Sequence, residues 1–380
     1  MKKILIVLGL AAAVVVAALT LPSLTSNKNN SSVTEVSIGA LLALSGPDKS
    51  FGVTQQRGMQ IAVDEINEAG GINGKKLEVE YADTKLTEDL GLQEYKRLVG
   101  DSGVKAIVGI TGSGVNLRLA PFAEKDEVVI FDSLATSPKL TDEGGKFFFR
   151  NIASDAYSGT VLSKWAIERN HKKIAVVYNS ENSWSTGLES AVKTALPESG
   201  GTFVLDSTAV LNSTDNFNSA IIAIRGKKPD AVFVCLMGRQ AGLFVSQAKA
   251  ANLNVPFYGT DPFSQKEFVD NAGDSLSQSW FVLPAEEKSE RYLKFEKKYQ
   301  DRFGDSADSI AAKAYDSVYV FAEAVKTLSD DHSGEAIRSA LKSVVYKGIT
   351  GENSFDDNND LKSAKFDRMR YEGRKRVVVQ

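Results

Sequence analysis

The chain has 380 residues, more than the roughly 250–300 at which single hydrophobic cores stop growing, so two domains are expected. Its 43% hydrophobic and 24% charged residues are ordinary for a globular protein. With 45 basic and 48 acidic residues the net charge is −3, which gives no global field for nucleic acid or an anionic membrane. A single cysteine, Cys235, lies in an apolar run, which excludes an intramolecular disulfide and a CxxC metal or redox site.

The first 33 residues have the pattern of a targeting segment. Lys2 and Lys3 precede an unbroken apolar span at 4–21, and a stretch rich in Asn, Ser and Lys follows. This pattern is typical of a secretory signal peptide. The span also reaches the lower length limit for a membrane-crossing helix, so an uncleaved N-terminal anchor is the alternative. No cysteine comes directly after the span, which excludes anchoring through a lipidated cysteine there. We expect an exported protein, in the periplasm or at the outer face of the cytoplasmic membrane.

Strands and helices alternate regularly through the first part of the chain. The predicted strands are 36–44, 76–81, 105–108 and 128–131, and the predicted helices between them are 55–69, 90–99 and 116–124. In the first helix Met59, Ala62 and Ile66 share one face, and Gly70 follows as a C-terminal breaker. Such alternation indicates a parallel sheet with helices on both faces.

The same alternation begins again after about residue 155. The predicted helices are 156–169, 187–196, 217–225 and 241–251, and the predicted strands are 173–178, 202–205, 231–236, 256–258 and 280–283. Helices at 290–303, 307–328 and 334–343 come too late for one α/β run, so we expect them to pack back on the first unit.

These patterns predict an α/β fold of two Rossmann-like lobes, each a parallel sheet flanked by helices. A three-segment hinge would join the lobes, with the ligand cleft between them. The first lobe would comprise residues 34–154 and 285–349, and the second lobe residues 155–284 and 350–380.

Two predicted strands lead directly into small hydroxyl residues. Thr111 and Ser113 follow the strand at 105–108, and Ser133, Thr136 and Ser137 follow the strand at 128–131. Ligand sites of parallel sheets lie beyond the carboxyl ends of the strands. Neighbouring strand ends would therefore offer hydroxyl and N–H groups to one small polar molecule. Ordinary βα turns also favour Gly, Ser and Thr, so this pattern by itself leaves both interpretations open.

Catalytic patterns are weak throughout the chain. The two histidines, His171 and His332, have no Cys or carboxylate cluster nearby, which disfavours a Ser/His/Asp hydrolase and a zinc centre. The chain has no GxSxG, Walker or GxGxxG motif, and its nearest look-alike, at 109–114, lacks the lysine and the spacing of a phosphate loop. We therefore expect a protein that is not an enzyme and that has no cofactor and no metal, with an exported hydrolase as the least favoured alternative.

Several segments together resemble one known family. They are IGALLALSGP…FG (38–52), RGMQIAVDEINEAGGINGKKLEVEYADT (57–84), AIVGITGS (106–113), LATSPKLT (134–141), FRNIASDAYSG (149–159) and SQAKAANLNVPFYGTD (246–261). From residue 36 to about 355 the chain is similar to the extracytoplasmic solute-binding proteins of branched-chain amino acid (leucine/isoleucine/valine) ABC transporters, which have the type I periplasmic binding fold.

The resemblance implies the substrate-binding component of an ABC importer, with membrane permease subunits as partners. It would capture a branched-chain or other small amino acid, or a close relative such as an amide. We expect a monomer with no nucleic-acid partner. The alternative is a membrane-tethered sensor of the same fold that passes ligand occupancy to a signalling partner.

The resemblance also implies how the head of an amino acid would be held. The first lobe would grip its carboxylate and ammonium with Ser113 and with the backbone and hydroxyl of a turn formed by Leu134, Ala135 and Thr136. Hydroxyl and N–H donors suit a carboxylate, and carbonyl and hydroxyl oxygens suit an ammonium. Asp261 on the second lobe takes the position of an acidic family residue that pairs with the ammonium. A helix N-cap ahead of a proline is the structural alternative for Asp261.

Further lining residues follow from the same resemblance. Phe51 and Trp184 stand where the family often has Tyr, and ordinary packing is the alternative for both. Asp155 lies at the crossing between the lobes and is expected to reach the cleft. Met237 would touch the ligand's side chain, although the family tends to carry an aromatic residue nearby. Arg239 would favour an acidic or amide-bearing ligand.

Overall fold

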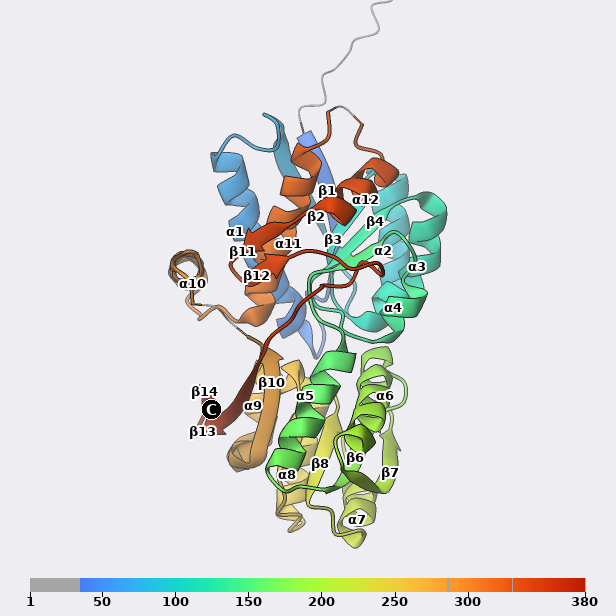
Figure 1. Ribbon diagram of the computed structural model, residues 1–380, viewed down its shortest axis with the longest axis vertical. Coiled ribbons are helices and arrows are strands. Elements are labelled where there is room, and N and C mark those ends of the chain that lie inside the picture. Colours follow the sequence, from blue (N-terminus) through green and yellow to red (C-terminus); the bar gives the residue numbers. More distant parts are fainter. Residues whose placement is uncertain (1–34, 286–287, 330, 380) are drawn as a thin grey trace, which may run out of the picture. The chain divides into compact units, whose positions relative to one another are not determined.

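The computed structural model describes residues 35–285, 288–329 and 331–379. The predicted targeting segment at 1–33 lies outside the described residues. Within these ranges no helix combines the length and the apolar character that crossing a membrane requires. Strands and helices alternate in two successive runs, and Figure 1 shows that each run gathers around its own sheet.

The first lobe is built on a parallel sheet whose described strands have the order β2-β1-β3-β4-β5. Their bounds are β1 Glu35–Leu42, β2 Lys76–Asp83, β3 Ala106–Ile110, β4 Val129–Asp132 and β5 Phe148–Arg150. The helices between them are α1 Lys49–Glu68, α2 Glu88–Gly100, α3 Ser113–Asp126 and the short α4 Lys139–Glu143. Since β1 lies between β2 and β3, the strand order reverses there, at the position where α/β sheets bind ligands.

Both faces of this sheet are buried. Along β1, Ile38, Ala40 and Leu42 face one core and Leu41 faces the other, with the two-residue period of a strand. The first face is covered by α1, α10 Glu290–Phe303, α11 Ser309–Lys326 and α12 Gly334–Ser343, and the second by α2 and α3 (Figure 1). The late helices therefore pack back on the first sheet, as the sequence predicted.

The second lobe has a sheet whose described strands have the order β14-β13-β10-β9-β8-β6-β7. The strands β6 Lys173–Asn179, β7 Thr202–Val210, β8 Ala231–Cys235, β9 Phe257–Gly259 and β10 Ser279–Pro284 are parallel. The strands β13 Phe366–Glu372 and β14 Lys375–Val378 add an antiparallel edge. Here the strand order reverses at β6, between β7 and β8.

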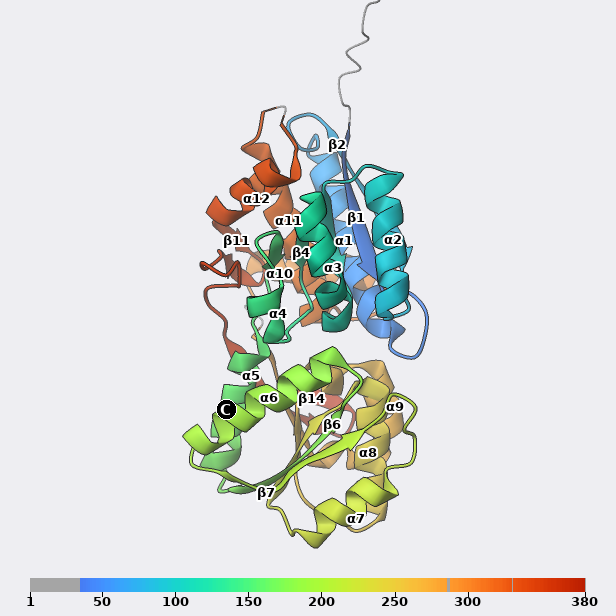
Figure 2. The same ribbon diagram turned by 90° about the vertical axis from the view of Figure 1, so that its right-hand side faces the viewer.

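Helices cover both faces of the second sheet as well (Figure 2). One face carries α5 Asp155–Glu168 and α6 Ser183–Glu198, and the other carries α7 Asn218–Gly226, α8 Gly238–Ala250 and α9 Lys266–Ala272. Two 3₁₀ helices, η1 Asp261–Ser264 and η2 Gly273–Gln278, flank α9. The single cysteine, Cys235, is buried in the core under α5 and α6.

The last crossing between the lobes comes later than the sequence predicted. Residues from 350 onward were assigned to the second lobe, but β12 Gly351–Asn353 pairs with β11 Tyr346–Gly348 beside α11. Phe355 is buried in the core of the first lobe, edge-on to Phe131 and Phe149. The chain reaches the second sheet only at β13. Phe355 lies in a polar stretch without periodicity, so no local pattern indicated its burial.

Candidate ligand-binding site

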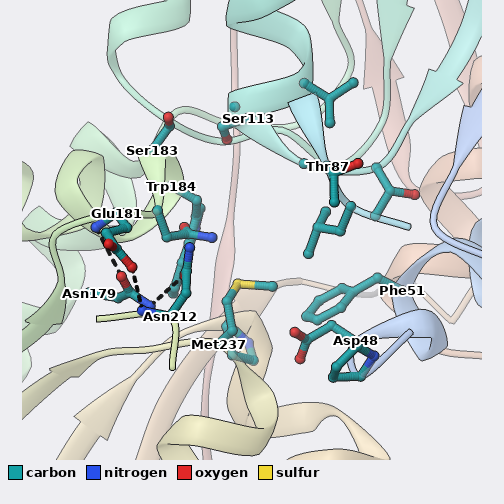
Figure 3. Close-up of a pocket in the computed structure, with 18 of the residues that line it drawn as sticks. Asp48, Phe51, Thr87, Ser113, Asn179, Glu181, Ser183, Trp184, Asn212 and Met237 are labelled. Atoms are coloured by element: carbon teal, nitrogen blue, oxygen red, sulfur yellow. Dashed lines mark hydrogen bonds between the residues drawn. The ribbon is translucent and has the colours of Figure 1, made fainter. Parts of the chain in front are cut away.

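A cavity of about 620 Å³ lies where the carboxyl ends of the two sheets face each other (Figure 3). The first lobe lines it from within residues 47–51, 85–88, 111–115 and at 134, and the second lobe from within residues 179–184, 212, 237–240 and 261–262. We call it the inter-lobe cavity. These segments follow β1 to β4 and β6 to β9, so both strand-order reversals open into it.

Most of the predicted site residues reach this cavity. Six of the nine line it, namely Phe51, Ser113 and Leu134 from the first lobe and Trp184, Met237 and Asp261 from the second. Ala135, Thr136 and Asp155 lie outside the lining. Direct contact of any of the nine with a ligand stays a prediction, but residues up to 210 positions apart in the sequence do share one cavity.

The turn after β4 is fixed by a buried carboxylate, Asp132. One of its oxygens accepts the N–H groups of Ser133 and Leu134, at 2.5 and 3.0 Å, and the other accepts that of Ala135 at 3.1 Å. Asn116 of α3 also donates to it, at 2.6 Å. Burial raises the pKa of Asp132 to about 6, and these hydrogen bonds oppose that rise. The N–H groups of Leu134 and Ala135 are thus engaged within the protein, and the predicted contact of this turn's backbone with a ligand stays a prediction.

Arg150 fixes the same turn from its carbonyl side. It is fully buried and donates to the carbonyls of Ala135 and Ser137, at 3.3 and 2.9 Å. Its other donors pair with both oxygens of Asp360, at 2.5 and 2.9 Å. Arg150 is not among the site residues predicted from the sequence. Its only signal was a charge at the end of the apolar run FFFR.

Ser113 opens α3 at the edge of the cavity. The preceding Gly112 has φ 101°, in the left-handed region that favours glycine. The hydroxyl oxygen of Ser113 accepts the N–H of Ser137 at 3.2 Å, which leaves its proton for donation. First-turn N–H groups lack intrahelical acceptors, and helix N-termini favour anions. This corner is therefore suited to a carboxylate.

Thr136 and Asp155 bind each other behind the cavity lining. The Thr136 hydroxyl donates to Asp155 at 2.6 Å, and the Asp155 N–H donates to the Thr136 carbonyl at 2.7 Å. Ser158 donates to the other carboxylate oxygen at 2.6 Å. Burial raises the pKa of Asp155, while the donors Ser158, Thr136 and Trp184 and the charge of Arg150 lower it. This pairing ties the turn after β4 to the start of α5.

Asp261 places a buried carboxyl group without a partner on the second lobe. It is only 8% exposed, and among the described residues no other residue donates a hydrogen bond to its carboxylate. Burial, with the charges of Asp155 and Asp308, raises its pKa to about 8. It lies inside η1, whose N-cap position is Thr260, so the N-cap alternative for Asp261 is wrong. An ammonium in the cavity would offset both causes of the raised pKa.

A polar network forms another part of the second-lobe wall (Figure 3). Asn179 donates to Asn212 and to Gln240, at 2.9 Å in both cases. Gln240 donates to the carbonyl of Leu211 at 2.8 Å, and Glu181 accepts the N–H of Asn212 at 2.8 Å. None of these residues is among the site residues predicted from the sequence. Their signal was the same as in the first lobe, polar residues directly after predicted strands.

Arg239 lines the cavity, but its charge is already paired. Its guanidinium makes two bonds to Asp215, at 2.7 and 2.8 Å. The prediction of an acidic ligand depended on this arginine. Since its guanidinium already has a carboxylate partner, Arg239 gives that prediction less support.

The two lobes are in contact along one edge of the cavity. Ser50 of the first lobe donates to Gln265 at 3.0 Å and also to Glu267. Nearby, Asp48 accepts the N–H of Arg239, and its pKa is raised to about 6 by burial and by the charge of Glu267. Asp48 Oδ1 is buried with no hydrogen-bond partner among the described residues.

Two doubly wound lobes with a cavity between their facing strand ends are typical of solute-binding proteins. In the described part of the chain, no group of three His, Cys, Asp or Glu residues is arranged to hold a metal ion. The chain belongs to the periplasmic binding protein family, whose model matches residues 35–373, and within it to the type I proteins of the branched-chain amino acid group. The predicted fold and family are thereby confirmed, and so is a protein that binds a solute rather than transforming it.

Individual relatives match over almost the same length. The leucine-, isoleucine-, valine-, threonine- and alanine-binding protein of Pseudomonas aeruginosa is 28% identical over 326 residues, 85% of this chain and 86% of that protein. The branched-chain amino acid transporter substrate-binding protein LivJ of Streptococcus pneumoniae, solved with isoleucine, is 28% identical with a TM-score of 0.82, covering 91% of this chain and 99% of that one. The leucine-binding protein LivK of Thermotoga maritima, at 21% identity, has a TM-score of 0.84 and covers 91% and 98%.

Proposed function

We propose that this protein is the exported substrate-binding component of an ABC importer. In this proposal it captures an amino acid in the inter-lobe cavity and delivers it to membrane permease subunits. The observation that carries the proposal is that the two walls of the cavity suit opposite charges. The Ser113 corner at the start of α3 suits an anion, and the unpaired carboxyl group of Asp261 would ionise more readily beside a cation. The head of an α-amino acid supplies both charges within one small molecule.

The remaining lining supports a small amino acid or an amide relative. Phe51 and Leu134 form an apolar cluster against which Met237 packs, and Trp184 adds an aromatic surface. Asn179 and Gln240 lie on the polar side of the cavity. An apolar patch beside amide groups suits a short aliphatic chain and tolerates a polar end. The relatives named above as binding branched-chain amino acids support the same ligand class.

Capture would follow closure of the two lobes about their crossings, since each lobe supplies only part of the site. A membrane-tethered sensor, the alternative from the sequence, has no observation in its favour. The relatives described above are named as binding or transport proteins.

The proposal is tested by a thermal-shift screen of amino acids, amides and short peptides. A ligand that binds only the folded state raises the melting temperature according to its affinity. We expect small apolar amino acids or their amides to raise it, with calorimetry giving one site per chain. Asp261→Asn should abolish the shift, whereas Asp274→Asn, at an exposed aspartate of the same lobe, should not. Failure of every amino acid and amide to shift the wild-type protein would refute the proposal.

A further inference from the structure

A second, smaller cavity of about 220 Å³ lies among the segments that cross between the lobes. Ala153 lines it from the crossing between β5 and α5, Pro284 and Ala285 from the end of β10, and residues 361–365 from the segment before β13. The first lobe closes it with α11 and with residues 350–352. We call it the hinge cavity. Each crossing seen in the described residues contributes to its wall.

One buried charged residue lines the hinge cavity, Lys313 on α11. The residue is 6% exposed and lines the cavity. Its backbone carbonyl accepts a bond from Asn151 at 3.1 Å, but within the described ranges its ammonium makes no hydrogen bond or ion pair. An ammonium has three donors and no acceptor. Leaving such a group buried without a partner costs several kcal/mol in general.

The acidic group that attracts Lys313, Asp316, already has other partners. Asp316, one helical turn beyond Lys313, accepts the N–H groups of Ile349 and Thr350 at 2.9 and 2.8 Å, and the hydroxyl of Thr350 at 2.5 Å. It attracts Lys313 through space but forms no bond to it. The donors of Lys313 are therefore left for whatever occupies the hinge cavity.

We propose that the hinge cavity binds a small monovalent anion, such as chloride or a short carboxylate, through the ammonium of Lys313. The volume suffices for an ion of this size, since one water molecule takes roughly 30 Å³ of liquid. Glu352 also lines the cavity and Asp316 lies behind it, so a divalent anion is disfavoured by repulsion. Burial lowers the pKa of Lys313 to about 8, which keeps the side chain mostly cationic at neutral pH.

The position of the site gives it a consequence for the main cavity. An anion here would touch segments that connect both lobes, so its binding would differ between lobe arrangements. Two sites coupled in this way affect each other's affinity by the same factor. The anion site itself does not depend on which solute the inter-lobe cavity takes.

The test is a melting curve of the exported chain at constant sodium concentration and ionic strength, with chloride replacing gluconate as a bulkier reference anion. Formate and sulfate series run in parallel. We expect a saturable rise in melting temperature, on the order of 2 °C, with chloride and formate but not with sulfate. Lys313→Met should remove the rise, because it keeps the aliphatic length and loses the charge. Lys347→Met, at an exposed lysine of β11, should keep it.

Equal chloride responses in the wild type and Lys313→Met would overturn the proposal, and so would the absence of a saturable response in the wild type. A second measurement does not depend on a variant. Crystals grown with bromide should show an anomalous peak within hydrogen-bonding distance of Lys313 Nζ. A hinge cavity that holds only water at high bromide would equally overturn the site, without bearing on amino-acid binding.

Discussion

Behind the first-lobe wall of the inter-lobe cavity the buried charges of Asp132 and Arg150 have partners within the protein, whereas the second-lobe wall holds Asp261 without one. Asp132 accepts backbone N–H groups and Arg150 pairs with Asp360, so the turn after β4 is set before any ligand arrives. Asp261 is buried, and its pKa is raised to about 8. The first wall thus supplies a turn of fixed geometry. The second wall supplies a carboxyl group that lacks a positive partner, which a ligand's ammonium can provide. Variants in the two walls should therefore fail in different ways.

The largest expected effect is on stability, from Arg150→Met in the first wall. The change leaves Asp360 buried without its partner, and breaking a buried ion pair costs about 3–5 kcal/mol of the free energy of unfolding. Urea unfolding measures this loss. Arg368→Met is the matched control, because its pair with Glu168 is exposed and should contribute about 1 kcal/mol or less. Equal losses in the two variants would mean that the buried pair does not hold the wall.

Asp261→Asn in the second wall should act in the opposite direction on stability. Truncating one partner of a buried charge pair costs about 2–5 kcal/mol, so amino-acid affinity should fall roughly 30-fold to several thousand-fold. The unliganded protein should melt at a higher temperature, because an uncompensated buried carboxylate is gone. Calorimetry and melting curves measure the two effects. The control is Asp261→Glu, which keeps an acidic group at this position and should retain binding. If Asp261→Asn instead lowers the melting temperature of the unliganded protein, the proposed difference between the two walls is wrong.

Ser113→Ala should weaken binding, and it should also lower the free energy of unfolding by about 1–3 kcal/mol, because the buried N–H of Ser137 loses its acceptor. A hydroxyl bonded to a charged group contributes about 1.5–3 kcal/mol, which corresponds to roughly a 10- to 150-fold loss of affinity. Ser183→Ala is the control, a serine that lines the cavity from the other lobe and whose hydroxyl reaches Glu88 only at 3.5 Å. Calorimetry with the best amino acid from the screen compares them. If Ser183→Ala loses more affinity than Ser113→Ala, the ligand's carboxylate does not bind at the start of α3.

The smallest expected effect is the change in amino-acid affinity and in stability for each pH unit, which the titration of Asp261 causes. Only its ionised form pairs with an ammonium, so affinity should rise about tenfold per pH unit up to about pH 8 and then level off. Stability follows the opposite sign, because a raised carboxyl pKa favours the folded state fully below about pH 4 and is lost as the pH approaches 8. Calorimetry and urea unfolding at pH 5.5 to 8.5 measure both slopes. If Asp261→Asn keeps either slope, another group is responsible for it.

The alternation of apolar runs and helical spacing determined the two α/β lobes from the sequence alone. The position of Ser113 just after a strand and of Asp261 after another also followed from the sequence, with the family resemblance assigning their roles. These features are local, since a strand end and its turn lie within a few residues of each other. Sheet order then brings neighbouring strand ends to one edge.

Only the tertiary structure decided which buried charges have partners. Arg150 and Asp360 are 210 residues apart, and their pairing requires the chain to stay with the first lobe past Phe355. That a carboxylate, Asp261, and an ammonium, Lys313, each lie in a cavity without a partner depends on the packing around them. Periodicity records which residues are buried but not what lies opposite them, because the neighbours of a buried charge come from segments that the sequence does not place side by side.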